Sequence, residues 1–371
     1  MSDFSRFVPS HIRKLAESNQ SRPLKQSGSD QRPIALNLNE NPFGPSPLAL
    51  KAIEKALSEV HRYPEIQATG LHEEIARFHN VECEQVLVTA GATELLCMIA
   101  RTLLAPRLNA ITSAKSFIVY KLATQVTEGR LIEVPVRNNG YDLDAIAGAI
   151  DENTRIIFVA NPNNPTGTLA TADEVDRFVD RLPDNVLLVL DEAYGDFAED
   201  FARKRGVTFS RSLDYVRQGR NVILLKTFSK AHGLAGLRIG YGIGPTQLIS
   251  LFAPTRTIFS ISSVAKGAAI AALHDSDHIE KAIKNNAEQA EVLSAELNRL
   301  GYPVAKTWAN FLYCEMGEDA SSFADRLQVG GVTVQPLGLW GAPCAIRVSI
   351  GTPEQNRRFV EVFESIARLN R

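Results

Sequence analysis

Three short motifs in the sequence carry side chains that could do chemistry together. Asp191-Glu-Ala-Tyr194 offers a carboxylate and a phenol. Ser229-Lys230 offers a hydroxyl beside an amine, and Arg238 follows the lysine eight residues later. A lysine that loses its solvent inside a pocket is a nucleophile at neutral pH, and a guanidinium beside a hydroxyl binds phosphate. The set therefore predicts imine formation with a phosphorylated aldehyde.

Two further motifs offer backbone amides and an amide side chain. Thr89-Ala-Gly-Ala-Thr-Glu94 has the composition of a helix start, and Asn161-Pro-Asn-Asn-Pro-Thr-Gly167 that of a turn. Taken alone, each motif is as well explained by a helix cap, a plain turn or a solvated charge. These motifs indicate a functional site only if the fold brings them together.

Short aliphatic segments come directly before most of these motifs. Residues 155–160 and 186–190 are apolar on both faces, which is typical of strands in a parallel sheet covered by helices. We expect strands at residues 86–89, 110–112, 131–134, 155–160, 186–190, 222–225 and 237–241, and helices at 48–61, 70–80 and 171–181. Such alternation predicts a doubly wound α/β domain, whose ligands bind beyond the carboxyl ends of the strands. The motifs should therefore share one edge of the sheet.

The pattern changes after about residue 275. A long amphipathic helix at 279–300 is followed by strands at 310–315, 332–336 and 345–350 and by helices at 321–329 and 353–369. We expect a large α/β domain with a mostly parallel sheet over residues 46–272. A smaller α+β domain should combine residues 273–371 with an N-terminal arm, 1–45, whose start is polar and broken by Pro9, Pro23 and Pro33.

Composition excludes several classes of protein. Basic and acidic residues are interspersed and sum to a formal net charge of −2, which argues against a nucleic-acid partner. The aliphatic runs are of strand length, and the first twenty residues lack the apolar segment of a secretory signal, so we expect a cytoplasmic protein without a membrane span. The four cysteines form no C-x-x-C pair and no zinc spacing, so we expect free thiols and no metal.

Pyridoxal 5′-phosphate is a cofactor whose requirements this set of residues meets. It needs an amine for its aldehyde, a carboxylate at its ring nitrogen, a donor at its phenolic oxygen and an anion site for its phosphate. Lys230 would supply the amine and Asp191 the carboxylate, while Tyr194 and Asn164 would bind the ring oxygen. The phosphate would be bound by the amides of Ala92 and Thr93, the Ser229 hydroxyl and Arg238.

These motifs resemble those of fold-type I pyridoxal-phosphate-dependent aminotransferases, and above all of histidinol-phosphate aminotransferases. The resemblance runs from about residue 35 to 365 and includes Leu36-Asn-Leu-Asn-Glu-Asn-Pro, Arg62-Tyr63-Pro64, Ala235-Gly-Leu-Arg-Ile-Gly240 and Ile346-Arg-Val-Ser-Ile-Gly-Thr352. It implies that Lys230 also moves the substrate proton and that Phe117 stacks on the cofactor ring. It further implies that Arg347 binds the substrate carboxylate and that Asn39 lies at the substrate. Tyr63 would reach the cofactor phosphate of a second subunit, which implies a homodimer with shared active sites.

The resemblance implies a ping-pong transfer of an amino group from an amino acid, or an amino-alcohol phosphate such as histidinol phosphate, to a 2-oxo acid. A decarboxylase or lyase of the same fold would use the same cofactor residues. An acyl-transfer motif at Ser263-Val-Ala-Lys266 has no companion motifs, and nothing indicates a DNA-binding regulator.

The substrate is less well defined than the cofactor. Family members that bind a substrate phosphate carry an Arg where this chain has Gln335, a Tyr near Ser10 and His11, and a Tyr-Asn pair at Phe259-Ser260. These departures indicate a substrate other than histidinol phosphate. Trp340 and Phe259 are compatible with an apolar side-chain pocket and equally with packing.

Overall fold

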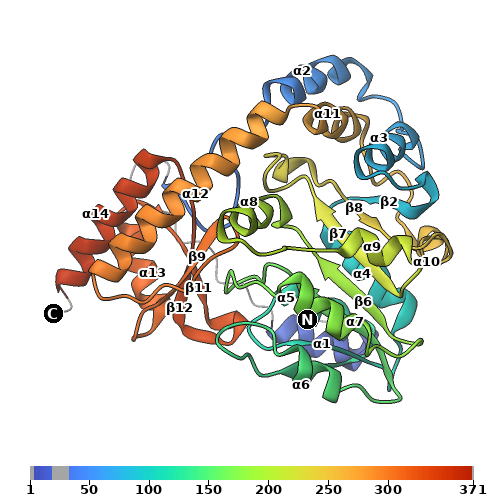
Figure 1. Cartoon of the computed structure of the whole chain (residues 1–371), viewed down its shortest axis with the longest axis horizontal. Helices are drawn as coiled ribbons and strands as arrows, with labels where there is room; N and C mark the ends of the chain where they lie inside the picture. Colours follow the sequence, from blue (N-terminus) through green and yellow to red (C-terminus); the bar gives the residue numbers. More distant parts are fainter. Residues whose placement is uncertain (1–3, 19–32, 370–371) are drawn as a thin grey trace.

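The computed structural model describes residues 4–18 and 33–369. It contains a seven-stranded sheet and a three-stranded sheet that lie apart in Figure 1, with the long helix α12 (Ser276–Arg299) running between them. A two-stranded sheet completes the strands of the described chain.

The seven-stranded sheet is parallel except for one strand. Its members are β2 (Val86–Thr89), β3 (Asn109–Ser113), β4 (Arg130–Val134), β5 (Thr154–Ala160), β6 (Leu187–Asp191), β7 (Val222–Thr227) and β8 (Gly240–Ile243), in the order β2-β8-β7-β6-β5-β3-β4. Strand β8 is antiparallel to both of its neighbours, and Gly240 at its start pairs with Thr89 and Thr227 at their ends. Residues that precede β8 therefore lie at the same edge as residues that follow the other strands.

Helices cover both faces of this sheet because its central strands are apolar on both faces. In β5, Ile156 and Phe158 pack into one buried cluster, with α4 and α5, while Ile157 and Val159 pack into another, with α7. The helices around this sheet are α2 (Pro47–Ala56), α3 (Thr69–His79), α4 (Ala92–Leu103), α5 (Ile118–Val126), α6 (Leu143–Gly148), α7 (Ala172–Val179), α8 (Gly195–Arg205), α9 (Ser212–Arg217), α10 (Thr246–Phe252) and α11 (Ser263–Leu273). The predicted α/β class with a mostly parallel sheet is confirmed.

The three-stranded antiparallel sheet has the order β11-β12-β9. Its strands are β9 (Phe311–Glu315), β11 (Gln335–Leu337) and β12 (Ala342–Ser349), and α12, α13 (Ala320–Val329) and α14 (Pro353–Leu369) pack on it. The short strands β1 (Ile34–Ala35) and β10 (Val332–Thr333) pair in parallel.

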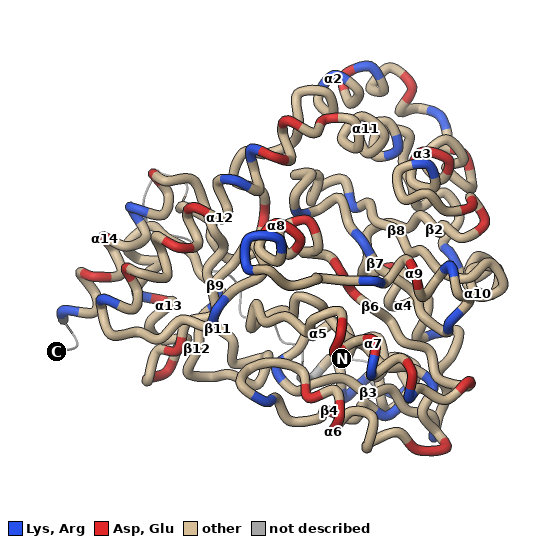
Figure 2. Tube along the Cα trace, in the orientation of Figure 1, with Lys and Arg blue, Asp and Glu red and all other residues tan. Residues whose placement is uncertain are grey.

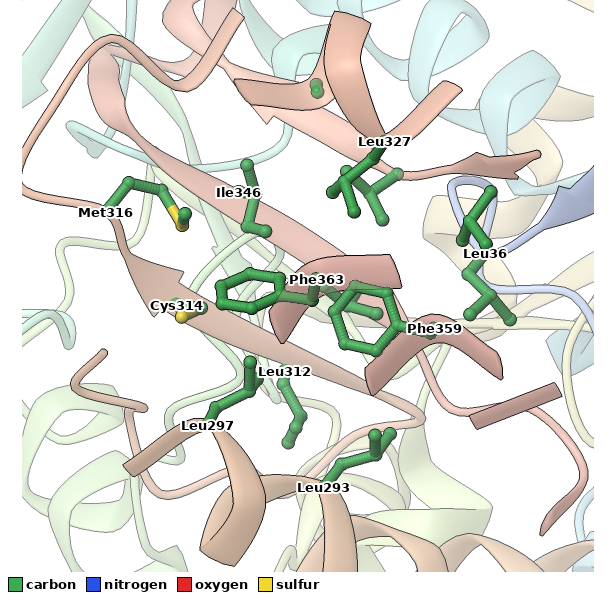
Figure 3. Close-up of a cluster of buried hydrophobic side chains, with 14 of the residues drawn as sticks. Leu36, Leu293, Leu297, Leu312, Cys314, Met316, Leu327, Ile346, Phe359 and Phe363 are labelled. Carbon is green, nitrogen blue, oxygen red and sulfur yellow. The ribbon is translucent and has the colours of Figure 1, made fainter. Parts of the chain in front are cut away.

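One buried cluster binds the N-terminal segment to this second unit. Leu36 belongs to the same buried cluster as Leu293 and Leu297 of α12 and Phe359 and Phe363 of α14, which are drawn in Figure 3. Residues before α2 thus contribute to the core of the C-terminal unit, as an arm joined to a small domain requires. The boundaries at 45/46 and 272/273 remain predictions.

Several expected elements differ from the observed ones. The expected strand 237–241 begins only at Gly240, because Ala235–Leu237 forms a 3-10 turn and Arg238 has a left-handed backbone with φ of 51°. The expected strand 332–336 is divided, since β10 pairs with β1 and β11 pairs with β12. The expected helix 48–61 ends at Ala56 and is followed by a 3-10 turn at Leu57–Glu59.

The first residues that the structure describes contain more regular secondary structure than expected. A 3-10 turn, Phe4–Phe7, precedes helix α1 (Ser10–Ser18), which packs against α5. Pro9 comes just before this helix, where its missing N–H costs no helical hydrogen bond. Pro23 lies outside the described residues.

Charged side chains of both signs are interspersed along the chain, as Figure 2 shows. Among the helices of the described ranges, none has the length and apolar character required to cross a bilayer.

Candidate active site

One cavity brings nearly all of the predicted site residues together. It has a volume of about 420 Å³ and is lined by loops at the carboxyl edge of the seven-stranded sheet and by residues of the three-stranded sheet. The predicted residues that line it are Asn39, Ala92, Thr93, Phe117, Asn164, Asp191, Tyr194, Ser229, Lys230, Arg238 and Arg347. The sequence alone did not place Leu38, Glu40, Ala160, Pro162, Ala193, Thr227, Ala235 or Gly236 there.

Lys230 lies in the turn between β7 and β8. Its Nζ donates to the carbonyl of Leu38 at 2.9 Å and lies 5.6 Å from the centre of the Tyr194 ring. Burial, with a smaller contribution from the charge of Arg347, lowers the pKa of Lys230 to about 7. Near neutral pH a large fraction of this amine is therefore unprotonated and able to attack a carbonyl.

Asp191 ends strand β6 and is buried. Burial raises its pKa to about 6, although its Oδ2 accepts a hydrogen bond from the Tyr120 hydroxyl at 2.9 Å and its Oδ1 one from the Ala193 amide at 3.2 Å. A buried carboxyl of this kind is stabilised in its charged form by a cation placed beside it. The protonated nitrogen of a pyridine ring is such a cation.

Tyr120 is a site residue that the sequence reasoning missed. It is fully buried in α5, with its ring stacked on Phe158 at a centroid distance of 4.8 Å and edge-on to Phe117 at 5.7 Å. Tyr120 follows Phe117 by three residues, and this helical spacing is the one signal that could have suggested it.

Tyr194 precedes α8, and its hydroxyl oxygen accepts two hydrogen bonds. Asn39 Nδ2 donates to it at 3.0 Å and Asn164 Nδ2 at 3.2 Å. Because both partners donate, the hydroxyl hydrogen of Tyr194 is left to donate to a ligand. Burial also raises the pKa of Tyr194, which keeps this phenol protonated.

Arg347 lies on β12 and is buried. Its Nη1 donates to Asn164 Oδ1 at 2.5 Å and its Nη2 to the Asn37 carbonyl at 2.7 Å. Its Nε is buried and has no hydrogen-bond partner within the described part of the chain. A carboxylate that entered the cavity could accept from the remaining hydrogens of the Arg347 Nη atoms.

The opposite end of the cavity is suited to a phosphate. Ala92 and Thr93 are the first two residues of α4, where backbone amides have no acceptor within the helix, and both line the cavity with Arg238. Arg238 Nη1 lies 3.4 Å from Ser229 Oγ and donates to the Ala235 carbonyl at 2.8 Å. Gly91 is needed at this point, because its φ is +85° and a Cβ there would lie 2.6 Å from Arg238 Nη2.

Tyr63 does not line this cavity. Its side chain is 84% exposed, and its ring packs against Phe259 at a centroid distance of 4.9 Å. Gln335 and Trp340 do line the cavity, whereas Phe259 and Ser260 do not.

Within residues 4–18 and 33–369, no group of three His, Cys, Asp or Glu side chains could hold a metal ion.

A reactive lysine, a buried acid, a phenol and a phosphate cradle at one edge of such a sheet define a pyridoxal-phosphate-dependent enzyme. A family model described as aminotransferase class I and II matches residues 31–363. The chain belongs to this family, and the predicted class, a pyridoxal-phosphate-dependent aminotransferase of fold type I, is confirmed.

Individual relatives agree with this assignment. The chain is 36% identical to the histidinol-phosphate aminotransferase of Akkermansia muciniphila, over 97% of this chain and 98% of that protein. It is 38% identical to histidinol-phosphate aminotransferase 2 of Pseudomonas aeruginosa, over 99% of each. The structure of the histidinol-phosphate aminotransferase of Sinorhizobium meliloti in complex with pyridoxal-5′-phosphate superimposes with a TM-score of 0.90, at 28% identity and with 100% of both chains covered.

A decarboxylase shares the fold. The L-threonine-O-3-phosphate decarboxylase of Porphyromonas gingivalis has a TM-score of 0.78 at 23% identity, and covers 90% of this chain and 99% of its own. At that identity the likeness concerns the fold alone.

Proposed function

We propose that this aminotransferase moves an amino group from an amino acid, or an amino-alcohol phosphate such as histidinol phosphate, to a 2-oxo acid, in two half-reactions at one site. The observation that carries the proposal is the Lys230 amine, with its pKa lowered to about 7, in one cavity with Asp191, Tyr194 and Arg347. Bound pyridoxal 5′-phosphate supplies an aldehyde that combines with amines and a ring that withdraws electrons from the substrate.

At the cofactor end, we assign each side chain one task. Asp191 would stabilise the protonated ring nitrogen, and Phe117 would pack against the ring. Tyr194 would donate to the ring oxygen, with Asn164 and Asn39 holding its hydroxyl in place. The amides of Ala92 and Thr93, Ser229 and Arg238 would bind the phosphate.

At the substrate end, Arg347 binds the carboxylate. Its contacts with Asn164 and Asn37 fix the guanidinium plane, so little freedom is lost when a carboxylate binds. Lys230 would hold the cofactor before an amino donor binds, and its free amine would then take the proton from the substrate carbon. The second half-reaction runs the same steps in reverse on a 2-oxo acid.

We further propose a homodimer in which Tyr63 contributes to the active site of the second subunit. Tyr63 and Phe259 form an exposed aromatic pair, and Leu57, Val60, Ile66 and Ile258 nearby in the sequence are also exposed. The two segments are joined by Arg256 Nη2, which donates to the Ile66 carbonyl at 2.6 Å. Exposed apolar groups of this density are typical of a protein interface. The cytoplasmic location expected from the sequence remains a prediction.

The test is a pair of half-reactions on the purified, cofactor-loaded protein. Mixing with an amino donor alone should abolish the visible absorbance of the bound cofactor and release one equivalent of 2-oxo acid. Adding a 2-oxo acid should restore the absorbance and release a new amino acid. Release of carbon dioxide, or of an eliminated group, in place of the 2-oxo acid would contradict transamination and favour a decarboxylase or lyase.

A further inference from the structure

The substrate end of the cavity is formed largely by one hairpin. Strands β11 and β12 pair so that Gln335 lies directly opposite Arg347. Directly paired residues place their side chains on the same face of a sheet, and both of these line the cavity. Trp340, from the turn between the two strands, lines it as well, with its ring centre 5.8 Å from Arg347 Cζ.

Of the cationic side chains that line the cavity, one is not assigned to the cofactor and can bind the substrate. The charged residues of its wall are Glu40, Asp191, Lys230, Arg238 and Arg347. Arg238 lies at the phosphate cradle, and Lys230 and Asp191 serve the cofactor. Arg347 therefore remains to bind one anionic group of the substrate. The other charged residue of the wall that is not assigned to the cofactor, Glu40, is acidic.

Among the described residues that line the cavity, none offers a further cation to a second anionic group on the substrate. The residue opposite Arg347 is the neutral Gln335, whose Nε2 already donates to the Pro336 carbonyl at 3.0 Å. Glu40, the acidic residue of the cavity wall that is not assigned to the cofactor, would repel a phosphate or carboxylate at the end of a side chain. Both effects weaken the binding of a doubly anionic substrate relative to a singly anionic one.

The cavity wall also offers apolar contact to a substrate. Leu38 and Trp340 line it and are not assigned to the cofactor. An apolar side chain that packs on these groups gains from burial, whereas a charged one would lose water without a partner.

Given the proposed transamination, on which this inference rests, we propose that the amino donor is an α-amino acid with an uncharged apolar side chain, aromatic or branched aliphatic. Gln335 and Trp340 set this preference. Arg347 binds the single carboxylate, and the indole of Trp340 packs on the side chain.

The test measures binding apart from catalysis. Calorimetry on the cofactor-loaded enzyme compares carboxylates that lack an amino group and cannot react, namely 3-phenylpropionate, glutarate and 3-phosphonopropionate. We expect 3-phenylpropionate to bind about tenfold or more tightly than either dianion, because a missing charge-assisted hydrogen bond alone changes a binding constant by about 10- to 100-fold.

Three variants sharpen the test. Gln335→Arg should reverse the order by tightening glutarate and 3-phosphonopropionate by about tenfold or more, because it adds a cation opposite Arg347. Trp340→Ala should weaken 3-phenylpropionate and leave glutarate nearly unchanged. Leu339→Ala is the matched control, because Leu339 lies in the same turn, is 74% exposed and does not line the cavity. It should bind all three compounds as the wild type does.

The outcomes separate this inference from the function on which it rests. Tighter binding of 3-phenylpropionate, together with loss of the cofactor's visible absorbance on mixing with phenylalanine or leucine, supports both. Equal or tighter binding of a dianion by the wild type, with histidinol phosphate or aspartate as the fastest donor, overturns the inference and leaves transamination intact. A protein whose cofactor absorbance responds to no amino donor overturns the proposed function and this inference with it.

Discussion

The two ends of the active-site cavity differ in how fully their polar groups are hydrogen-bonded. At the cofactor end, both oxygens of Asp191 accept hydrogen bonds, and the Tyr194 hydroxyl accepts two. At the substrate end, Arg347 Nε and Trp340 Nε1 are buried without a partner in the described ranges. The polar groups of the first end are hydrogen-bonded before any ligand binds, whereas two donors of the second end are not. Substitutions at the cofactor end should therefore affect every donor, and those at the substrate end should discriminate between donors.

Lys230→Ala should produce the largest effect. The variant should lose the visible absorbance of the bound cofactor and turn over roughly 10⁴-fold more slowly with every donor, because both the covalent attachment and the proton carrier are lost. Spectra and steady-state rates measure this, with Lys121→Ala as a surface control. Activity close to that of the wild type would contradict the assignment of Lys230.

Asp191→Asn should come next, with a loss of about 10²- to 10³-fold in rate. The cofactor should still bind through its phosphate, so the absorbance of the loaded protein should remain. The loss should be similar for all donors, because the ring nitrogen takes part in each half-reaction. A loss confined to one donor would place Asp191 at the substrate instead.

Arg347→Lys should lower kcat/KM by about 10- to 100-fold for amino donors that carry a carboxylate. The planar guanidinium can donate two parallel hydrogen bonds to a carboxylate, whereas the lysine ammonium binds it as a single point charge. An amine without a carboxylate, such as phenethylamine, should react at the same rate with the variant and the wild type. The comparison of these two kinds of amine tests most directly whether the cofactor end and the substrate end of the cavity act separately. An equal loss for both amines would contradict it.

Tyr120→Phe should give the smallest change, about two- to tenfold in rate at neutral pH. The Tyr120 hydrogen bond lowers the pKa of Asp191, so its removal should raise that pKa further above its ordinary value. Asp191 must be ionised to act, and activity falls as the pH drops through its pKa. The acid limb of the pH–rate profile should therefore move to higher pH in the variant, whereas a merely structural role would leave the limb in place.

The convergence of the residues assigned to the cofactor could be predicted from the sequence because they stand in short motifs after recognisable strands. Asp191, Asn164 and Lys230 each follow an apolar run, and the parallel sheet brings such positions to one edge. Arg238 reaches that edge for a different reason, since it precedes an antiparallel strand whose direction the apolar pattern did not reveal.

Contacts that depend on helix packing or on strand register could not be predicted in this way. Tyr120 reaches Asp191 only because of the rotation of α5 over the sheet, which no local pattern specifies. The position of Gln335 opposite Arg347 depends on the register of a hairpin with an irregularity between Pro336 and Leu337. The chain was expected to pass through this region as one strand from 332 to 336, and its division between two sheets is set by pairing with β1.

The turn from Lys230 to Arg238 joins two adjacent strands and holds an amine at one end and a guanidinium at the other. One loop therefore carries both the group assigned to the cofactor's aldehyde and a group assigned to its phosphate. A one-residue insertion between these positions would leave the β7–β8 ladder paired yet shift the amine relative to the guanidinium. Because the cofactor is a molecule of fixed length, such an insertion should weaken its binding without disturbing the sheet.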